Sequence, residues 1–386
     1  MHGTLTQTSR PVSPPDRRRT ASIAVSALAA AALIIGAVWT AAPAALAQEP
    51  TLTGLATEVA AIREILADRR HTFDILQKQI DDLLWFERVG DVALIDKVRL
   101  WGPTKWREPS ETAIGAGQPL KFWAYIFIPR DSDRKGKSPL LVFPHGGVHG
   151  DFTTYYTHIV RELLAQGYVI VAPEYRGSTG YGRGMYESID YGGLETEDAH
   201  ACRAYMLENY SWLDPDRVGM IGWSHGGLIS LLNVFNHPKD YAAVYAGVPV
   251  SDLIARLGYL GESYAAYFSA DYHIGQTIAD NIAEYRRRSP AWNAEKLQTP
   301  LLVYTNKGDE DVNVLEVEHL IKSLKAAGKD FTYEIFDLPG GHSFDRLDTR
   351  QAQEIRLRIY RFLAQYLKPP HTFKNVAELH AAGYRS

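Results

Sequence analysis

The chain has 386 residues, 46% of them hydrophobic and 22% charged, and a formal net charge of −4 at pH 7. This length and composition allow one large α/β domain, or two small ones, with a packed core. The balance of charge is mildly acidic, and nothing in the composition suggests a nucleic-acid partner. The single cysteine, Cys202, excludes an intrachain disulfide and a thiolate metal site, and we expect it to be buried in a helix.

The first fifty residues predict an export signal. A basic stretch, DRRRTAS, precedes an apolar run over 21–42 and the small-x-small pattern of Ala45 and Ala47. We therefore assign residues 1–47 to a signal peptide and expect a periplasmic or secreted protein. If the signal stays uncleaved, the apolar run would anchor the chain in a membrane. A chain without disulfides suits the bacterial envelope.

The segment from 51 to 88 predicts a long amphipathic helix. Its apolar residues follow one another at alternating steps of four and three, with Arg69 interrupting the series. They are Leu55, Val59, Ile62, Leu66, Phe73, Leu76, Ile80 and Leu83. This apolar face packs on the chain's own domain or pairs with a second copy, which would make a homodimer.

After residue 120, strand-like apolar runs alternate with helical patterns. The segment KFWAYIFIP (121–129) alternates like an edge strand. Further strands are predicted at 140–143, 168–172, 217–222, 242–247, 301–304 and 332–336, and helices at 153–166, 196–210, 226–236, 314–327 and 348–367. This alternation predicts an α/β fold with a mostly parallel sheet and helices on both faces.

The segment 252–290 is rich in tyrosine and lies between two predicted core strands. Four of these tyrosines are Tyr259, Tyr264, Tyr267 and Tyr272. Two interpretations stay open: an excursion over the active-site edge of the sheet, where loops bring specificity, or an ordinary crossover whose helices pack through the tyrosines.

The sequence GWSHGG (222–227) contains the pattern G-x-S-x-G around Ser224. An apolar strand, 218–221, precedes it, and a helix with one apolar face follows over 226–235. A nucleophilic serine of an open α/β sheet sits on such a sharp strand-to-helix turn. Because the bare pattern also arises by chance, the interpretation depends on partner residues.

A nucleophilic serine needs a base, and the base needs an orienting carboxylate. The loop after strand 301–304 contains Asp309, Glu310 and Asp311, and the Gly340–Gly341 turn after strand 332–336 leads to His342. The chain order serine, acid, histidine is that of hydrolases built on such a sheet.

The oxyanion donors are expected from two backbone segments. The N–H of His225 follows the serine, while the side chain of His225 points away from the attack geometry. Gly146 and Gly147, in the early loop PHGGVHG, expose further amides. The nearby histidines, His145 and His149, lack a third ligand, so we expect no metal site.

Several motifs together make the chain similar to the catalytic domain of the prolyl oligopeptidase family of serine hydrolases. They are PHGG (144–147), PEYRGSTGYGR (173–183), DYGGLETEDAHA (190–201), LDPDRVGMIGWSHGG (213–227), GDEDV (308–312) and GGHSF (340–344). The resemblance implies an α/β-hydrolase fold and a triad of Ser224, Asp309 and His342, with no cofactor. In the family the acid stands three positions before a valine of the same loop. That valine is Val312 here, so the resemblance selects Asp309 over Asp311.

The same resemblance suggests His145, Tyr175 and Asp311 as substrate-contacting residues. His145 takes the position of the residue that precedes the paired glycines beside the oxyanion hole. Asp311 stands where the family often has an arginine or asparagine, and an acidic side chain does not suit a peptide carbonyl.

The domain organisation expected from the sequence has four parts. They are the signal peptide (1–47), a helical N-terminal extension (48–119), the catalytic α/β-hydrolase domain (120–369) and a C-terminal tail (370–386). The extension is too short for the β-propeller that many family members carry.

The expected function is the hydrolysis of peptide or acyl-amide bonds in small-molecule or short peptide substrates. A carboxylesterase on the same fold is the first alternative. A catalytically idle envelope module that interacts through its long helix is the second.

Overall fold

The computed structural model describes residues 51–105, 110–112 and 115–384. The described residues divide into two compact units, one up to residue 65 and one from residue 66 onward. The predicted signal peptide, 1–47, lies outside the described residues, as does the membrane anchor that it would form if uncleaved. None of the helices in the described part of the chain has the length and apolar character of a membrane span.

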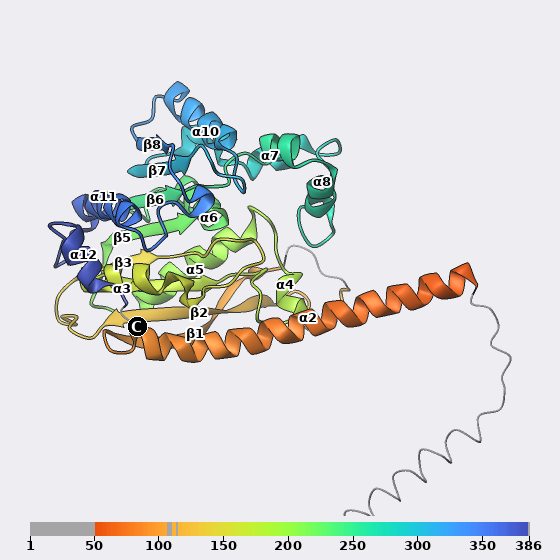
Figure 1. Ribbon diagram of the computed structural model, residues 1–386, viewed down its shortest axis with the longest axis horizontal. Coiled ribbons are helices and arrows are strands. Elements are labelled where there is room, and N and C mark those ends of the chain that lie inside the picture. The colour runs from red at the N-terminus through yellow and green to blue at the C-terminus, as the bar shows by residue number, and fades with distance from the viewer. Residues whose placement is uncertain (1–50, 106–109, 113–114, 385–386) are drawn as a thin grey trace, which may run out of the picture. The chain divides into compact units, whose positions relative to one another are not determined.

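The core of the second unit is an eight-stranded, mostly parallel sheet (Figure 1) in the order β1-β2-β4-β3-β5-β6-β7-β8. The strands are β1 (Ala93–Thr104), β2 (Pro119–Pro129), β3 (Ser138–Val142), β4 (Val169–Glu174), β5 (Leu213–Trp223), β6 (Ala243–Gly247), β7 (Leu301–Asn306) and β8 (Thr332–Phe336). From β4 to β8 all neighbours are parallel, whereas β1 with β2 and β2 with β4 are antiparallel. The predicted parallel sheet is therefore confirmed.

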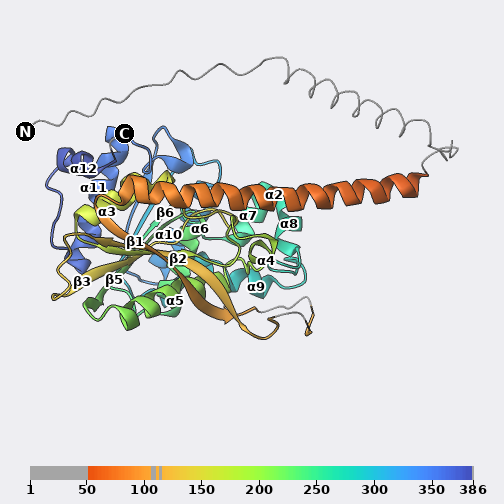
Figure 2. The ribbon, with the colours of Figure 1, turned by 90° about the horizontal axis from the view of Figure 1, so that it is seen from below.

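Helices cover both faces of this sheet, as Figure 2 shows for α3 and α11 on one side and α5 on the other. The α-helices are α2 (Leu52–Val89), α3 (Thr157–Ala165), α4 (Arg183–Tyr186), α5 (Leu194–Asn209), α6 (His225–Asn236), α7 (Leu253–Leu260), α8 (Glu262–Ser269), α9 (Ile282–Arg287), α10 (Val314–Ala326), α11 (Arg350–Leu367) and α12 (Val376–Ala382). Short 3₁₀ helices lie at Thr154–Tyr156, Pro290–Trp292, Ala294–Lys296 and Gly341–Ser343. Cys202 is buried in α5, as expected.

The sheet extends beyond the domain boundaries that the sequence suggests. Strand β1 lies within the predicted extension, yet it pairs with β2 over most of its length, from Ala93 to Trp101. Strand β2 is consequently an interior strand, and its interpretation as an edge strand is wrong. Helix α12, in the predicted tail, packs against α11 and α3. Alternating hydrophobicity marks a half-buried strand but does not reveal whether another segment covers its edge.

The part of α2 that follows residue 65 packs on the sheet through one face. The side chain of Lys78 is 2% exposed; its ammonium group lies 2.7 Å from Glu174 Oε1 and donates to the carbonyl of Phe152 at 2.7 Å. Burial acts to lower the pKa of Lys78, but the carboxylates of Glu174 and Asp151 outweigh burial and raise it. Two turns further on, Trp85 is fully buried and stacks on Phe152. The predicted helix is confirmed, and this face of it is fixed to the domain that contains the sheet.

The tyrosine-rich segment forms α7, α8 and α9 between β6 and the 3₁₀ helices before β7. Tyr264 of α8 lines the pocket described below, whereas the Tyr259 hydroxyl bonds to the buried Glu316 of α10. The segment therefore combines the two interpretations: some tyrosines pack the crossover and one reaches the pocket.

Candidate active site

Ser224 lies on a strained turn between β5 and α6. Its backbone has φ 58° and ψ −120°, a conformation that is costly for a residue with a side chain. The flanking glycines are required by close approach: a Cβ at Gly222 would lie 2.3 Å from the carbonyl oxygen of Gly226, and one at Gly226 would lie 2.3 Å from that of Pro144. The G-x-S-x-G pattern therefore has a steric reason at both glycines, and the turn raises Ser224 above the end of β5.

His342 and Asp309 come from the loops after β8 and β7 and are hydrogen-bonded to each other. The His342 Nδ1–Asp309 Oδ2 distance is 2.7 Å. Asp309 is 5% exposed, and its Oδ1 accepts from the backbone N–H groups of Asp311 at 2.9 Å and Val312 at 2.8 Å. These bonds hold the carboxylate in one orientation, with Oδ2 directed at the imidazole. The positive φ of the paired glycines at 340 (101°) and 341 (51°) turns the chain into the 3₁₀ helix that bears His342.

The backbone amides expected at an oxyanion hole lie beside Ser224. The loop after β3 passes so close to the serine that a Cβ on Gly146 would lie 3.5 Å from that of Ser224. Gly147 has φ +75°, which favours glycine. His225 is the first residue of α6, and a helix leaves its first N–H groups without an intrahelical partner. Its side chain is buried beside Glu195, with 3.3 Å between Nε2 and Oε1, and so points away as expected.

One pocket of about 450 Å³ joins these elements. Its lining includes Ser224, His342 and both loop glycines, together with His225 and Asp311. The structure therefore brings the proposed nucleophile, the proposed base and the proposed oxyanion donors to one cavity at the carboxyl edge of the sheet. Asp309 lies behind His342, as an orienting carboxylate must.

Two of the suggested substrate-contacting residues do not belong to the lining of this pocket. His145 and Tyr175 are both 0% exposed, and their rings stack with centroids 4.2 Å apart. The Tyr175 hydroxyl lies 3.0 Å from the carbonyl oxygens of both His145 and Gly147. Burial lowers the pKa of His145 to about 3. The pair therefore holds the backbone of the glycine loop by hydrogen bonds from inside the domain. Of the three suggested residues, only Asp311 lines the pocket.

Other lining residues were not singled out from the sequence. The Tyr156 hydroxyl accepts a bond from the N–H of Gly146 at 3.3 Å, and Arg346 donates to the carbonyl of His342. Tyr191 and Arg256 also line the cavity. Tyr191 lies in the motif DYGGLETEDAHA (190–201), and Arg256 lies in the tyrosine-rich segment 252–290, whereas no quoted motif contains Tyr156 or Arg346.

A pair of histidines, of which His149 lines the pocket, joins the loop after β3 to the tyrosine-rich segment. Nε2 of His149 and Nε2 of His273 are 3.2 Å apart, and the ring of His149 stacks on Tyr186 with centroids 3.5 Å apart. Burial lowers the pKa of His149 to about 4 and also lowers that of His273. Both imidazoles are therefore neutral at pH 7. His149 adds an uncharged aromatic surface to the pocket lining, and His273, which is 0% exposed, lies behind it.

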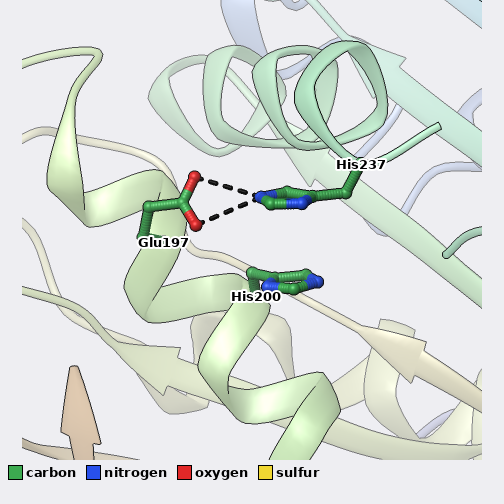
Figure 3. A group of neighbouring side chains, drawn as sticks. All are labelled: Glu197, His200 and His237. Carbon is green, nitrogen blue, oxygen red and sulfur yellow. Dashed lines mark hydrogen bonds and ion pairs between the residues drawn. The ribbon is translucent and has the colours of Figure 1, made fainter. Parts of the chain in front are cut away.

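Two groups among the described residues have a donor set that could hold a metal ion. One is Asp309, Asp311 and His342, where the Asp309–His342 bond already has the geometry of an acid–base pair. The other lies outside the lining of the pocket and consists of Glu197, His200 and His237 (Figure 3), with all donor atoms within 4.8 Å of one another. The sequence gives no signal for the second group, because its residues come from α5 and from the end of α6 and no spacing motif links these two segments.

The curated relatives match part of the chain. It is 27% identical over 224 residues to an uncharacterized peptidase of Bacillus subtilis, a match that covers 58% of this chain and 34% of that protein. It is 26% identical over 238 residues to the acylamino-acid-releasing enzyme of Mus musculus, covering 58% and 31%. The chain thus spans about a third of the length of these curated relatives.

Solved structures share the fold. The acylaminoacyl peptidase of Pyrococcus horikoshii superposes with a TM-score of 0.60 at 20% identity, covering 75% of this chain and 44% of that one. A puromycin-hydrolyzing peptidase of Mycobacterium tuberculosis gives 0.59 at 23% identity, with 71% and 39% covered. These likenesses show that the sheet is that of an α/β hydrolase. The model of the prolyl oligopeptidase family matches residues 154–370, which is more than half of the chain. The matched part includes Ser224, Asp309 and His342. The chain therefore belongs to the prolyl oligopeptidase family.

Proposed function

We propose that the protein is a serine hydrolase that cleaves peptide or acyl-amide bonds through an acyl-enzyme. The single observation that supports this most is that one cavity joins Ser224 on its strained turn, His342 bonded to a buried carboxylate, and the glycine loop. Each of the three has one role in acyl transfer, and few other reactions need all of them together.

In the proposed mechanism Ser224 Oγ attacks the carbonyl carbon while His342 Nε2 takes the hydroxyl proton. Asp309 accepts from Nδ1–H, which leaves Nε2 as the basic nitrogen and stabilises the imidazolium that forms. The N–H groups of His225 and Gly147 donate to the oxyanion, whereas the N–H of Gly146, also expected as a donor, is bonded to the Tyr156 hydroxyl. His342 then protonates the leaving amine, and a water activated by the same nitrogen releases the acyl group.

The pocket favours small substrates with an apolar or aromatic group. Its volume of about 450 Å³ is at the lower end of the range typical of small-molecule sites. Tyr191 and Tyr264 supply aromatic wall, and Val148 and Val250 supply aliphatic wall. Relatives of this chain are acylamino-acid-releasing enzymes, so an N-acylated amino acid or short peptide is the substrate class that we propose.

The experiment is a paired turnover assay on the full chain. N-acetyl-amino-acid p-nitroanilides test amide cleavage, and p-nitrophenyl esters with the same acyl part test ester cleavage. We expect both to be hydrolysed, with phenylalanyl and leucyl anilides preferred over glycyl anilides. Ester hydrolysis with no anilide turnover would replace the peptidase proposal by a carboxylesterase. Inertness toward both would favour an interaction module on an idle hydrolase fold.

A further inference from the structure

Helix α2 carries a heptad repeat whose apolar positions from Leu66 onward are not covered by the domain that the helix packs on. Written as heptads, the a and d positions of the part up to Ile65 are Leu52, Leu55, Val59 and Ile62. In the part from Leu66 onward the apolar a and d positions are Leu66, Phe73, Leu76, Ile80 and Leu83. These nine residues are here called the seam, and Arg69 stands at the one polar position within it. The repeat lasts more than four heptads, which is longer than a coiled coil requires.

The hydrolase domain packs on the opposite side of the helix. His71, Lys78 and Trp85 are buried residues at intervals of seven, and they occupy the f position, which lies opposite a and d. Within residues 66–89 the helix is therefore held through its f face, while its a and d positions point away. Packing on the parent domain does not use the apolar face that the sequence predicted for it.

The seam residues are exposed in each of the two parts of the helix. The exposed fractions run from 50% to 71% between Leu66 and Leu83, and from 41% to 87% between Leu52 and Ile62. The five seam residues from Leu66 to Leu83 present on the order of 550 Å² per copy, and the four up to Ile62 on the order of 400 Å². An interface of standard size buries roughly 800 Å² on each partner. The first value alone reaches the upper end of the roughly 300–600 Å² of the largest apolar patch on a typical monomer.

We propose that the seam pairs with the seam of a second copy of this chain, forming a two-stranded coiled coil that joins two hydrolase domains. Knobs at a and d fit holes made by the same pattern, so the repeat is complementary to itself. The charges beside the seam are complementary between two parallel copies. Glu58 at position g and Arg63 at position e lie five residues apart, which is the spacing of a g–e' ion pair. In a parallel pair Glu58 of one copy meets Arg63 of the partner subunit.

Sedimentation equilibrium of the full chain at about 1–100 µM tests the pairing. We expect a dimer for the native protein. The double substitution Leu76→Lys with Ile80→Lys should weaken association at least about 100-fold, because it places four charges in the paired seams. Arg69→Leu should strengthen association about tenfold, because it removes the polar interruption.

The matched control is Ala60→Lys with Ala61→Lys, which adds the same charge at exposed b and c positions of the same helix. It should leave the dimer intact, and all three variants should keep the native esterase rate, which reports folding. A native chain that is monomeric throughout, or a dimer that the seam variant leaves unchanged, would overturn the proposal. Flotation of a monomeric native chain with phosphatidylcholine–phosphatidylglycerol vesicles, lost in the seam variant, would assign the seam to a membrane surface instead.

A separate observation concerns the Glu197–His200–His237 group. Glu197 and His200 are one turn apart on α5, and His237 is the C-cap residue that follows α6. Both oxygens of Glu197 lie 3.1 Å from His237 Nε2, and the two imidazoles are stacked 3.8 Å apart (Figure 3). His200 Nε2 lies 2.8 Å from Asp240 Oδ2, which leaves Nδ1 as its second donor atom.

This arrangement has the parts of a transition-metal site. A histidine whose remote nitrogen donates to a carboxylate has its tautomer fixed and its other nitrogen free to ligate. The side chains are 23% to 31% exposed, so an ion and a water ligand can reach them. The rings are nearly parallel, at 4°, so one imidazole must turn about its Cβ–Cγ bond before both lone pairs meet at one point.

We propose that Glu197, His200 and His237 bind one Zn²⁺, with water as the fourth ligand. Two nitrogens and one carboxylate oxygen are a ligand set that zinc takes in tetrahedral sites. The ion would tie α5 to the end of α6, the helix that begins after Ser224, and it would therefore act on stability rather than on the chemical step.

Titration of the chelator-treated full chain with Zn²⁺ by calorimetry, and with Co²⁺ by visible absorption, tests this site. We expect one ion per chain, a tetrahedral Co²⁺ spectrum and a higher Tm with Zn²⁺. Glu197→Gln with His237→Gln should weaken binding at least about tenfold. His319→Gln is the control, because its Nδ1 also pairs with a carboxylate, Asp252, at 2.6 Å. Zinc binding that survives the double substitution contradicts the proposal and would place the ion at the Asp309–Asp311–His342 group. Zinc binding that is equally lost in the control variant contradicts it as well.

Discussion

Replacing Ser224 by alanine should lower kcat on anilide and ester substrates by about four to six orders of magnitude, with KM changed little. The loss is large because alanine has no hydroxyl with which to form the covalent acyl intermediate. Any remaining rate would come from the oxyanion donors and from positioning of the substrate. The measurement is single-turnover and steady-state kinetics on the same substrate pair, with the native chain assayed in parallel.

The fold should survive this change. The backbone strain at φ 58° belongs to the turn between Gly222 and Gly226, and alanine takes the place of serine in it at similar strain. An unchanged Tm together with lost turnover would therefore locate the defect in chemistry. Retention of more than about one per cent of the native rate would contradict Ser224 as the nucleophile.

Replacing Asp309 by asparagine should lower kcat by about four orders of magnitude. The asparagine side chain can keep the bonds from the N–H groups of Asp311 and Val312 through its oxygen, so the loop should hold its shape. Its amide would then present N–H to His342 Nδ1, which forces the imidazole proton onto Nε2. The nitrogen that must accept the serine proton would no longer be basic.

Glu310→Gln is the matched control, because Glu310 is the exposed neighbour in the same loop and loses the same charge. It should leave kcat within about twofold of the native value. The pH dependence of kcat/KM separates a tautomer effect from a general loss of charge. A proportionate loss in both variants would show that local charge, rather than the orientation of His342, controls the rate.

Many features follow from local sequence alone. The alternation of apolar strands and amphipathic helices predicts the parallel sheet, because burial on both faces requires continuous apolar strands. The three site positions follow from their places after β5, β7 and β8, since the carboxyl ends of parallel strands meet at one edge. The 4–3 spacing from Leu55 to Leu83 likewise predicts a helix with one apolar face.

Other features depend on long-range packing. Strand β2 is an interior strand because β1, an earlier segment of the chain, pairs with its outer edge. His145 and Tyr175 are fully buried because other segments pack around them. Their positions in the motifs do not reveal this burial and therefore favour contact with a substrate. The parts of the pocket lining made by Tyr156, Arg256 and Arg346 come from three separate segments.

The sequence by itself determined the fold class, the order of the elements and the identity of the serine, acid and histidine candidates, because these depend on residue spacing and strand ends. Only the tertiary structure decided which face of α2 the domain uses. A helical repeat marks an apolar face but not its partner. Here the domain buries Lys78 and Trp85, which lie on the opposite face of the helix. The same reason explains the group of Glu197, His200 and His237, which exists only because α5 lies beside the end of α6.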